Sequence, residues 1–191
     1  MSLTLYVVRH GQAASNIEKK AYDDSEAELT MHGKMQAMDT GKKLKAEKVE
    51  FDAIYCSKYK RAKETCAIAL ESAGWKKKRK DVHYLISLRE RDLKGIYGVS
   101  FDADYWKELQ YFTTDAAEKA GIETFDHLEN RAKGFICAMK KKYPDGANIL
   151  VFTHGLLELA FYTSVYGRPA SGTTYHLNLL KNGEYRVYEI E

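Results

Sequence analysis

Apolar runs alternate along the chain with segments in which hydrophobic side chains recur at helical spacing. Four of the runs are short and rich in apolar and β-branched residues, which is typical of buried strands. They lie at residues 3–9, 51–56, 82–87 and 148–153. The segments with helical spacing lie at residues 30–48, 57–73, 100–142 and 155–166. A last pair of runs, 175–180 and 184–190, flanks a Lys-Asn-Gly turn and predicts a hairpin.

The alternation of strands with helices predicts an α/β fold. We expect three layers, with a mostly parallel sheet, helices on both of its faces, and an antiparallel edge strand supplied by the hairpin. Residues 100–142 predict two or three helices with a break near Gly121, and we expect a helical cap insertion around residues 95–125. Since the chain has 191 residues, two prolines and no linker-like composition, a single domain over residues 1–191 is predicted.

Two helix ends and one helix face can be predicted from individual residues. Thr30 is a suitable N-cap for the helix that follows it, and Gly74 is suited to end the helix over 57–73. Met31, Met35 and Met38 recur near helical spacing after Thr30. We therefore expect the three methionine side chains to fill the core rather than to form a cofactor site.

Composition and charge exclude several classes of protein. Hydrophobic residues make up 45% of the chain and charged residues 30%, as in an ordinary globular protein. The net charge of +3 is too small to indicate a nucleic-acid partner, and the basic run at 75–80 is interpreted as a solvated connection. The three cysteines fit no zinc or disulfide spacing, and no signal peptide is recognisable. Reduced thiols and a cytoplasmic location are expected.

Residues 149–167 are nearly all apolar and almost long enough to span a membrane. His154 and Glu158 interrupt this run, and its character changes at residues 153–155. A strand, a turn and a buried helix explain the segment better, so no membrane association is expected. Glu158 lies one turn after His154 and either orients the imidazole ring or satisfies a neighbouring polar group.

Polar side chains follow three of the predicted strands at the point where each strand ends. His10 follows the first strand, Ser57 the second and His154 the fourth, and Arg61 comes four residues after Ser57. Because the carboxyl ends of parallel strands share one edge of a sheet, we expect these groups to converge. Gly11 follows His10 and would let the backbone approach a ligand closely.

Phosphoryl transfer is the chemistry that such a group of side chains suits. A phosphate that leaves water needs fixed positive charges, and Arg9 and Arg61 can each offer a forked donor to it. One such pair at close range is worth about 4 kcal/mol at an effective dielectric of about 20. A neutral imidazole such as His10 can attack phosphorus, and a carboxylic acid must protonate the leaving oxygen. Cys56 and Arg61 are one residue too close for a cysteine-phosphatase loop, and no P-loop sequence occurs.

Five sequence blocks resemble the motifs of the histidine phosphatase superfamily, whose members have the phosphoglycerate-mutase-like fold. In chain order they are RHGQAASN at 9–16, LTMHGKMQA at 29–37, DAIYCS at 52–57 with RAKET at 61–65, LRERD at 88–92, and THG at 153–155. The blocks follow the order of the family, and the resemblance covers residues 3–160.

The resemblance implies a role for each matched residue. His10 would be the nucleophile that carries the phosphoryl group, and Glu90 would donate a proton and then activate water. The residues that would clamp the phosphoryl group are Arg9, Arg61 and His154. Further contacts with phosphate or substrate are expected at Gly11, Asn16, Ser57 and Gly155. One branch of the family has an acidic aspartate after the second histidine, so Gly155 at that position favours Glu90 as the acid and the mutase-like branch.

Two positions depart from the family pattern. Ala13 stands where many members have threonine or serine, which removes one hydroxyl contact to phosphate. The glycine expected after Glu90 comes one residue late, at Gly95. Alternative candidates for the acid are Asp92, Asp102 and Glu108.

The predicted activity is hydrolysis of a small phosphate monoester through a phosphohistidine on His10. Mutases of the family are longer and carry extra basic segments, and no Arg-Arg pair follows residue 100. The aromatic-rich residues 101–112 either pack into the core or cap the site. Two alternatives stay open: mutase-type phosphoryl transfer, and a phosphate-ester-binding protein without turnover. No metal or other cofactor and no nucleic-acid partner is expected, and the oligomeric state is open.

Overall fold

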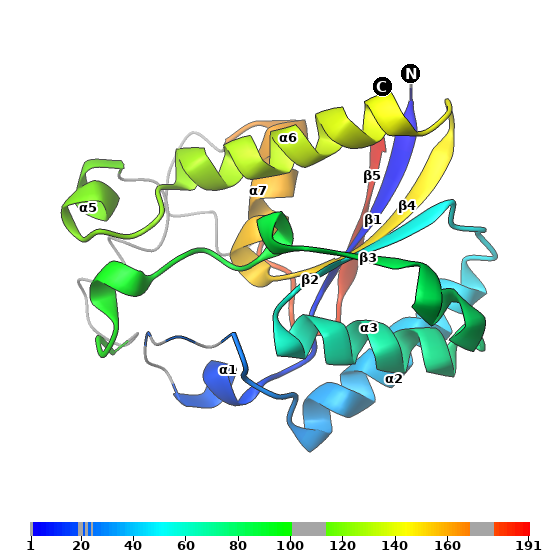
Figure 1. The fold of residues 1–191 in the computed structure, drawn as a ribbon, viewed down its shortest axis with the longest axis horizontal. Coiled ribbons are helices and arrows are strands. Elements are labelled where there is room, and N and C mark those ends of the chain that lie inside the picture. Colours follow the sequence, from blue (N-terminus) through cyan, green and yellow to red (C-terminus); the bar gives the residue numbers. More distant parts are fainter. Residues whose placement is uncertain (1, 19–20, 22, 24, 101–113, 169–177) are drawn as a thin grey trace.

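A five-stranded sheet lies at the centre of the computed structural model, which describes residues 2–18, 21, 23, 25–100, 114–168 and 178–191 (Figure 1). The strands, in the spatial order β3-β2-β4-β1-β5, are β3 (Val82–Leu85), β2 (Ala53–Ser57), β4 (Ala147–Thr153), β1 (Leu3–Arg9) and β5 (Tyr185–Ile190). Strands β1 to β4 are parallel, and β5 runs antiparallel to β1 at the edge. The predicted mostly parallel sheet with an antiparallel edge strand is confirmed.

Helices cover both faces of this sheet (Figure 1). One face carries α2 (Met31–Ala46) and α3 (Lys60–Ser72), and the other carries α6 (Phe125–Lys142) and α7 (Gly155–Tyr166). The alternation along β1 fits this arrangement, because Tyr6 and Val8 belong to the apolar cluster under α3 while Leu5 and Val7 belong to the cluster under α6 and α7. The three-layer α/β architecture is thereby confirmed.

The strand register brings three chain segments to one edge of the sheet. Arg9 pairs with Thr153 at the ends of β1 and β4, and Cys56 pairs with Phe152 near the ends of β2 and β4. His10, Ser57 and His154 therefore leave the sheet at neighbouring positions. The convergence expected from the sequence is confirmed.

Several element boundaries differ from the predicted ones. Helix α3 begins at Lys60 rather than at residue 57, because Ser57 still belongs to β2. A short helix, α1 (Ala14–Glu18), lies between β1 and α2 outside every helix range predicted from the sequence, and a 3-10 helix (Lys76–Asp81) contains most of the basic run that connects α3 to β3. Of the predicted hairpin, residues 175–177 lie outside the described residues and 178–180 belong to no strand. Within the described part of the chain, β5 pairs only with β1.

The buried face of α2 contains several small residues beside Leu44, and the prediction for its methionines was wrong. Met31, Met35 and Met38 are 75%, 58% and 44% exposed. Gly33, Ala37 and Gly41 are among the residues that α2 buries instead. The helix packs so closely that a Cβ at position 41 would lie 2.1 Å from a backbone oxygen of α3. Long side chains at helical spacing do not fit such a contact, so they face solvent.

The N-cap of α2 is confirmed, since the Thr30 side chain accepts a hydrogen bond from the Gly33 N–H at 3.0 Å. The predicted break near Gly121 is confirmed as well, between α5 (Thr114–Lys119) and α6.

The described residues of the segment 95–125 lie beyond the end of the sheet (Figure 1). A small apolar cluster there contains Ala21, Ile96, Ala117 and Ile122, separate from the two clusters that flank the sheet. The aromatic residues 101–112 lie outside the described residues. None of the helices in the described part of the chain is long and apolar enough to cross a membrane. Residues 149–167 include the end of β4 and all of α7, as predicted.

Candidate active site

His10 lies directly after β1, is 2% exposed, and has both ring nitrogens engaged. Its Nδ1 donates to the Gly11 carbonyl oxygen at 2.7 Å, and its Nε2 accepts from the Arg61 Nε at 3.0 Å. A carbonyl can only accept and a guanidinium can only donate, so the proton sits on Nδ1 and the lone pair on Nε2. Burial, followed by the charges of Arg61 and Arg9, lowers the pKa of His10 well below 6.5. The imidazole is neutral at pH 7.

Arg61 is placed by the start of α3. The Tyr59 N–H donates to the Ser57 Oγ at 3.2 Å, which orients the turn between β2 and the helix. Arg61 then lies in the first turn of α3 and is 1% exposed. Its guanidinium lies 5.2 Å from the centre of the Tyr59 ring. A buried cation beside the lone pair of His10 is an arrangement suited to an anion that binds between them.

His154 follows β4 and is fully buried. Its Nε2 and the Ser57 Oγ lie 2.8 Å apart. The ring stands edge-on to the rings of His10 and Tyr59, with centroid distances of 5.1 and 5.2 Å. Burial and then the charge of Arg61 lower the pKa of His154 well below 6.5, and its Nδ1 has no hydrogen-bond partner among the described residues.

Arg9 ends β1 and lies against the first residue of α7. A Cβ at Gly155 would lie 3.0 Å from both Cζ and Nε of Arg9, so the glycine makes room for the guanidinium. One terminal nitrogen of Arg9 donates to the Leu180 carbonyl oxygen, while Nε has no partner in the described part of the chain. Burial lowers the pKa of Arg9 below its usual value, but this residue stays charged at any physiological pH.

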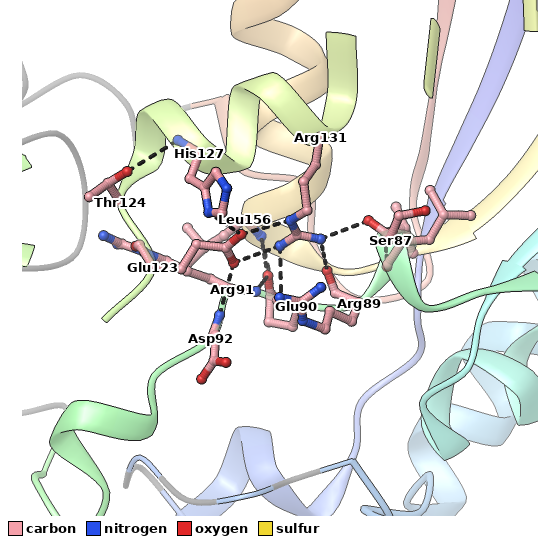
Figure 2. A network of polar contacts seen from close by, with 12 residues as sticks. Ser87, Arg89, Glu90, Arg91, Asp92, Glu123, Thr124, His127, Arg131 and Leu156 are labelled. Atoms are coloured by element: carbon pink, nitrogen blue, oxygen red, sulfur yellow. Dashed lines mark hydrogen bonds and ion pairs between the residues drawn. The ribbon is translucent and has the colours of Figure 1, made fainter. Parts of the chain in front are cut away.

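The Glu90 carboxylate lies at the N-terminus of α7. Its two oxygens accept from the Leu156 N–H at 3.2 and 3.4 Å, and one also accepts from the Arg91 N–H at 2.9 Å (Figure 2). A helix N-terminus favours negative charge, and this one begins at Gly155, against which Arg9 packs. Glu90 is thus brought to the same end of the sheet as the two histidines.

The other candidates for the acid are less well placed. The Asp92 carboxylate instead accepts from the Lys94 N–H at 3.0 Å. Asp102 and Glu108 lie outside the described residues. The position of Gly95 follows from packing, because a Cβ there would lie 1.8 Å from the Ala120 oxygen. Gly95, which comes one residue later than the family pattern predicts, is therefore explained by its close approach to Ala120 rather than by the Glu90 carboxylate.

Gly11 and Asn16 hold the loop after β1. The Gly11 N–H donates to the Thr65 Oγ1 at 3.0 Å, and a Cβ at Gly11 would lie 2.3 Å from the Gly33 oxygen. The close approach at Gly11 is therefore to the backbone of α2, whereas the sequence suggested a ligand. The Asn16 Oδ1 accepts from the Ala13 N–H at 2.9 Å, and its exposed amide NH₂ has no partner among the described residues.

Sequence reasoning missed a contact that spans most of the chain. Asn182 donates from Nδ2 to the His10 oxygen at 3.1 Å, and the Gly183 N–H reaches the oxygens of both Arg9 and His10 at 3.1 Å. The Lys-Asn-Gly sequence predicts a turn, but no local signal indicates that this turn packs on the end of β1.

The sequence also left the role of Glu158 open. Its carboxylate contacts Tyr188 and Arg186 and so satisfies neighbouring polar groups.

The sequence pattern of the histidine phosphatase superfamily (branch 1) matches residues 5–191. A protein of Salmonella choleraesuis (strain SC-B67) named "Probable phosphoglycerate mutase GpmB" is 25% identical over 173 residues, which cover 88% of this chain and 77% of that protein. In the described part of the chain, no cluster of histidine, cysteine and acidic residues could hold a metal ion.

Solved structures have the same fold. The phosphoglycerate mutase from Bacillus anthracis str. Sterne matches with a TM-score of 0.71 and 24% identity over 86% of this chain and 80% of that one. The mycobacterial glucosyl-3-phosphoglycerate phosphatase Rv2419c, solved with VO3, matches with a TM-score of 0.74 and 21% identity over 96% and 90%. Since the superfamily pattern covers almost the whole chain, and the folds agree as well, this protein belongs to the histidine phosphatase superfamily, branch 1.

Proposed function

We propose that the protein hydrolyses small phosphate monoesters through a phosphohistidine on His10. The observation that carries this proposal is the state of the His10 ring. Its Nδ1–H is bound to the Gly11 carbonyl oxygen, and its Nε2 lone pair is directed at the buried Arg61 cation. A neutral imidazole in this tautomer is ready to attack an electrophile at Nε2, and a phosphate ester is the electrophile that buried arginines would attract.

In the first step, the His10 Nε2 attacks phosphorus and the bond from phosphorus to the ester oxygen breaks. The Glu90 carboxyl group gives a proton to the departing oxygen, so the alcohol leaves neutral. The phosphoryl oxygens lie between Arg9, Arg61 and His154. The unpartnered Arg9 Nε and His154 Nδ1 support this arrangement, because buried polar atoms normally have partners and an oxyanion would supply them.

In the second step, water attacks the phosphorus of the phosphohistidine while the Glu90 carboxylate takes a proton from the water. The bond from nitrogen to phosphorus breaks, the electron pair returns to Nε2, and inorganic phosphate leaves. The amide NH₂ of Asn16 and the backbone near Ser57 would contact the phosphate or the alcohol part of the substrate.

The three unpaired cysteines support the cytoplasm as the site of action.

Release of p-nitrophenol from p-nitrophenyl phosphate tests the proposal. We expect turnover by the wild type and a loss of at least about 10³-fold in His10→Ala, since the nucleophile itself is removed. Labelled substrate should leave an acid-labile phosphoryl group on the wild type and none on the variant. Equal inactivity of both proteins, with phosphate esters still bound, would instead identify a binding protein without turnover.

Mutase activity is the second candidate, and the names of the Salmonella and Bacillus anthracis relatives favour it. A mutase must return the phosphoryl group to its substrate before water reaches the phosphohistidine. Incubation with 3-phosphoglycerate separates the two activities. If the 2-isomer forms faster than inorganic phosphate is released from any ester tested, the hydrolase proposal is wrong.

A further inference from the structure

Glu90 lies in a chain segment that has neither helix nor strand to fix its backbone. Residues 89–93 follow a 3-10 helix (Ile86–Leu88) and belong to no regular element. Backbone carbonyls in such a segment need partners from elsewhere in the molecule. Arg131, on α6, supplies them: one terminal nitrogen donates to the oxygens of Ser87 at 2.7 Å and Arg89 at 2.9 Å, and the other reaches the Glu90 oxygen at 3.4 Å (Figure 2).

The remaining donors of Arg131 go to the Glu123 carboxylate. Nε donates to one carboxylate oxygen at 2.8 Å, and a terminal nitrogen donates to the other at 2.7 Å. Together with the three carbonyl contacts, this uses all five N–H groups of the guanidinium. The two side chains are 11% and 4% exposed, so the pair is shielded from water and its geometry is fixed from both sides.

Glu123 holds the segment beyond the acid. The same carboxylate oxygen that faces the terminal nitrogen of Arg131 accepts from the Asp92 N–H at 3.1 Å. The main-chain oxygen of Glu123 accepts from the Arg91 Nε at 2.6 Å. Arg131 thus binds the chain before and at Glu90, and Glu123 binds it directly after. Figure 2 shows the acid between these contacts, with its carboxylate directed at the Leu156 N–H.

We propose that Arg131 and Glu123 are positioning residues for the proton transfer, because they hold the backbone of residues 87–92 so that the Glu90 carboxylate meets the leaving oxygen. The inference rests on the proposed function, in which Glu90 is the acid. It assigns to α6, which otherwise only covers the sheet, a part in the chemistry at the start of α7. A displacement of about 1 Å in such a group can cost ~10²-fold in rate.

Comparison of two esters of similar size tests this role. p-Nitrophenolate is a stabilised leaving group that departs with little help from an acid, whereas the alkoxide from benzyl phosphate needs a proton. The quantity to compare is kcat/KM, because it reports the step that breaks the ester bond. In Arg131→Lys and Glu123→Gln, we expect kcat/KM to fall by about 10²-fold for benzyl phosphate and by less than ~3-fold for p-nitrophenyl phosphate.

Two further variants separate failure of this inference from failure of the proposed function. Glu90→Gln should reproduce the same leaving-group dependence more strongly; if it does not, or if the wild type cleaves neither ester, the proposed function is wrong. The positioning role is refuted if Glu90→Gln behaves as expected but Arg131→Lys lowers kcat/KM equally for both esters, or lowers it for neither.

The matched control is Glu129→Gln. Glu129 lies on the same helix, is 8% exposed at its side chain, and forms a two-pronged pair with Arg168 that does not touch residues 87–92. Removing one partner of a buried pair destabilises any protein, so this variant measures that general effect. We expect the ratio of the two kcat/KM values to stay at the wild-type value in Glu129→Gln.

Discussion

Glu158→Gln should make the protein more stable at pH 8 and leave its stability nearly unchanged at pH 5. The Glu158 side chain is fully buried in α7, where Tyr188 donates to Oε1 at 2.5 Å and Arg186 lies 3.1 Å from the same oxygen. The other oxygen, Oε2, has no partner among the described residues. Burial raises the pKa of Glu158 from 4.5 to about 7, although Arg186 and the Tyr188 hydroxyl act in the opposite direction.

The sign and size of the effect follow from this pKa. Between pH 4.5 and about 7 the folded protein keeps a proton on Glu158 that the unfolded chain releases. The free energy of unfolding therefore decreases as the pH rises through this window, by about 1.4 kcal/mol per pH unit and ~3 kcal/mol in all. Glutamine resembles the protonated acid in shape and can still accept from Tyr188, so the variant avoids this loss.

Urea unfolding of both proteins at pH 5, 6, 7 and 8 measures the difference directly. Other titrating groups cancel, because they are common to the two proteins. Glu129→Gln is the control. Burial acts to raise the pKa of Glu129, but its hydrogen bonds with Arg168 outweigh burial, and the pKa is lowered. Glu129→Gln should therefore reduce the free energy of unfolding by an amount that does not change between pH 5 and pH 8. A difference between wild type and Glu158→Gln that stays constant from pH 5 to 8 would refute the reasoning.

Substitutions at four other positions have expected outcomes. Arg61→Lys should lower kcat/KM for p-nitrophenyl phosphate by about 10²-fold or more, since a fixed, forked donor next to His10 is lost; a loss below ~3-fold would contradict this role. Gly155→Ala should raise KM about tenfold in the same assay, because the added Cβ displaces the Arg9 guanidinium by a few tenths of an ångström. Thr30→Ala should cost about 1 kcal/mol in urea unfolding and Thr30→Ser much less, as expected for an N-cap. Met35→Gln should change stability by less than ~0.5 kcal/mol, because the side chain faces solvent.

The parts of the site that lie at strand ends could be predicted from the sequence. Each buried strand is an apolar run, and in a parallel sheet the residue after the run has to lie at one common edge. His10, Ser57 and His154 are therefore located by the hydrophobic pattern alone, before any contact is known. Arg61 follows from the same pattern, since the first turn of the next helix begins close to the strand end.

Contacts between distant segments could not be predicted in this way. No local pattern indicates that Asn182 would donate to the His10 carbonyl, because the two residues are 172 positions apart. The methionine prediction failed for a related reason. Hydrophobic periodicity assumes that the largest apolar side chains face the core, but the backbones of α2 and α3 approach so closely at Gly41 that a Cβ there would overlap a backbone oxygen of α3.

The two halves of the proposed mechanism are held by different kinds of structure. The backbone at His10 and His154 is fixed by the ends of β1 and β4, which the hydrogen bonds of the whole sheet support. Glu90 instead depends on an irregular segment held by the Arg131 guanidinium. A change at Arg131 can therefore move the acid without moving the phosphate-binding groups. On this reasoning, the leaving groups that the protein accepts can change while its fold and its affinity for phosphate are retained.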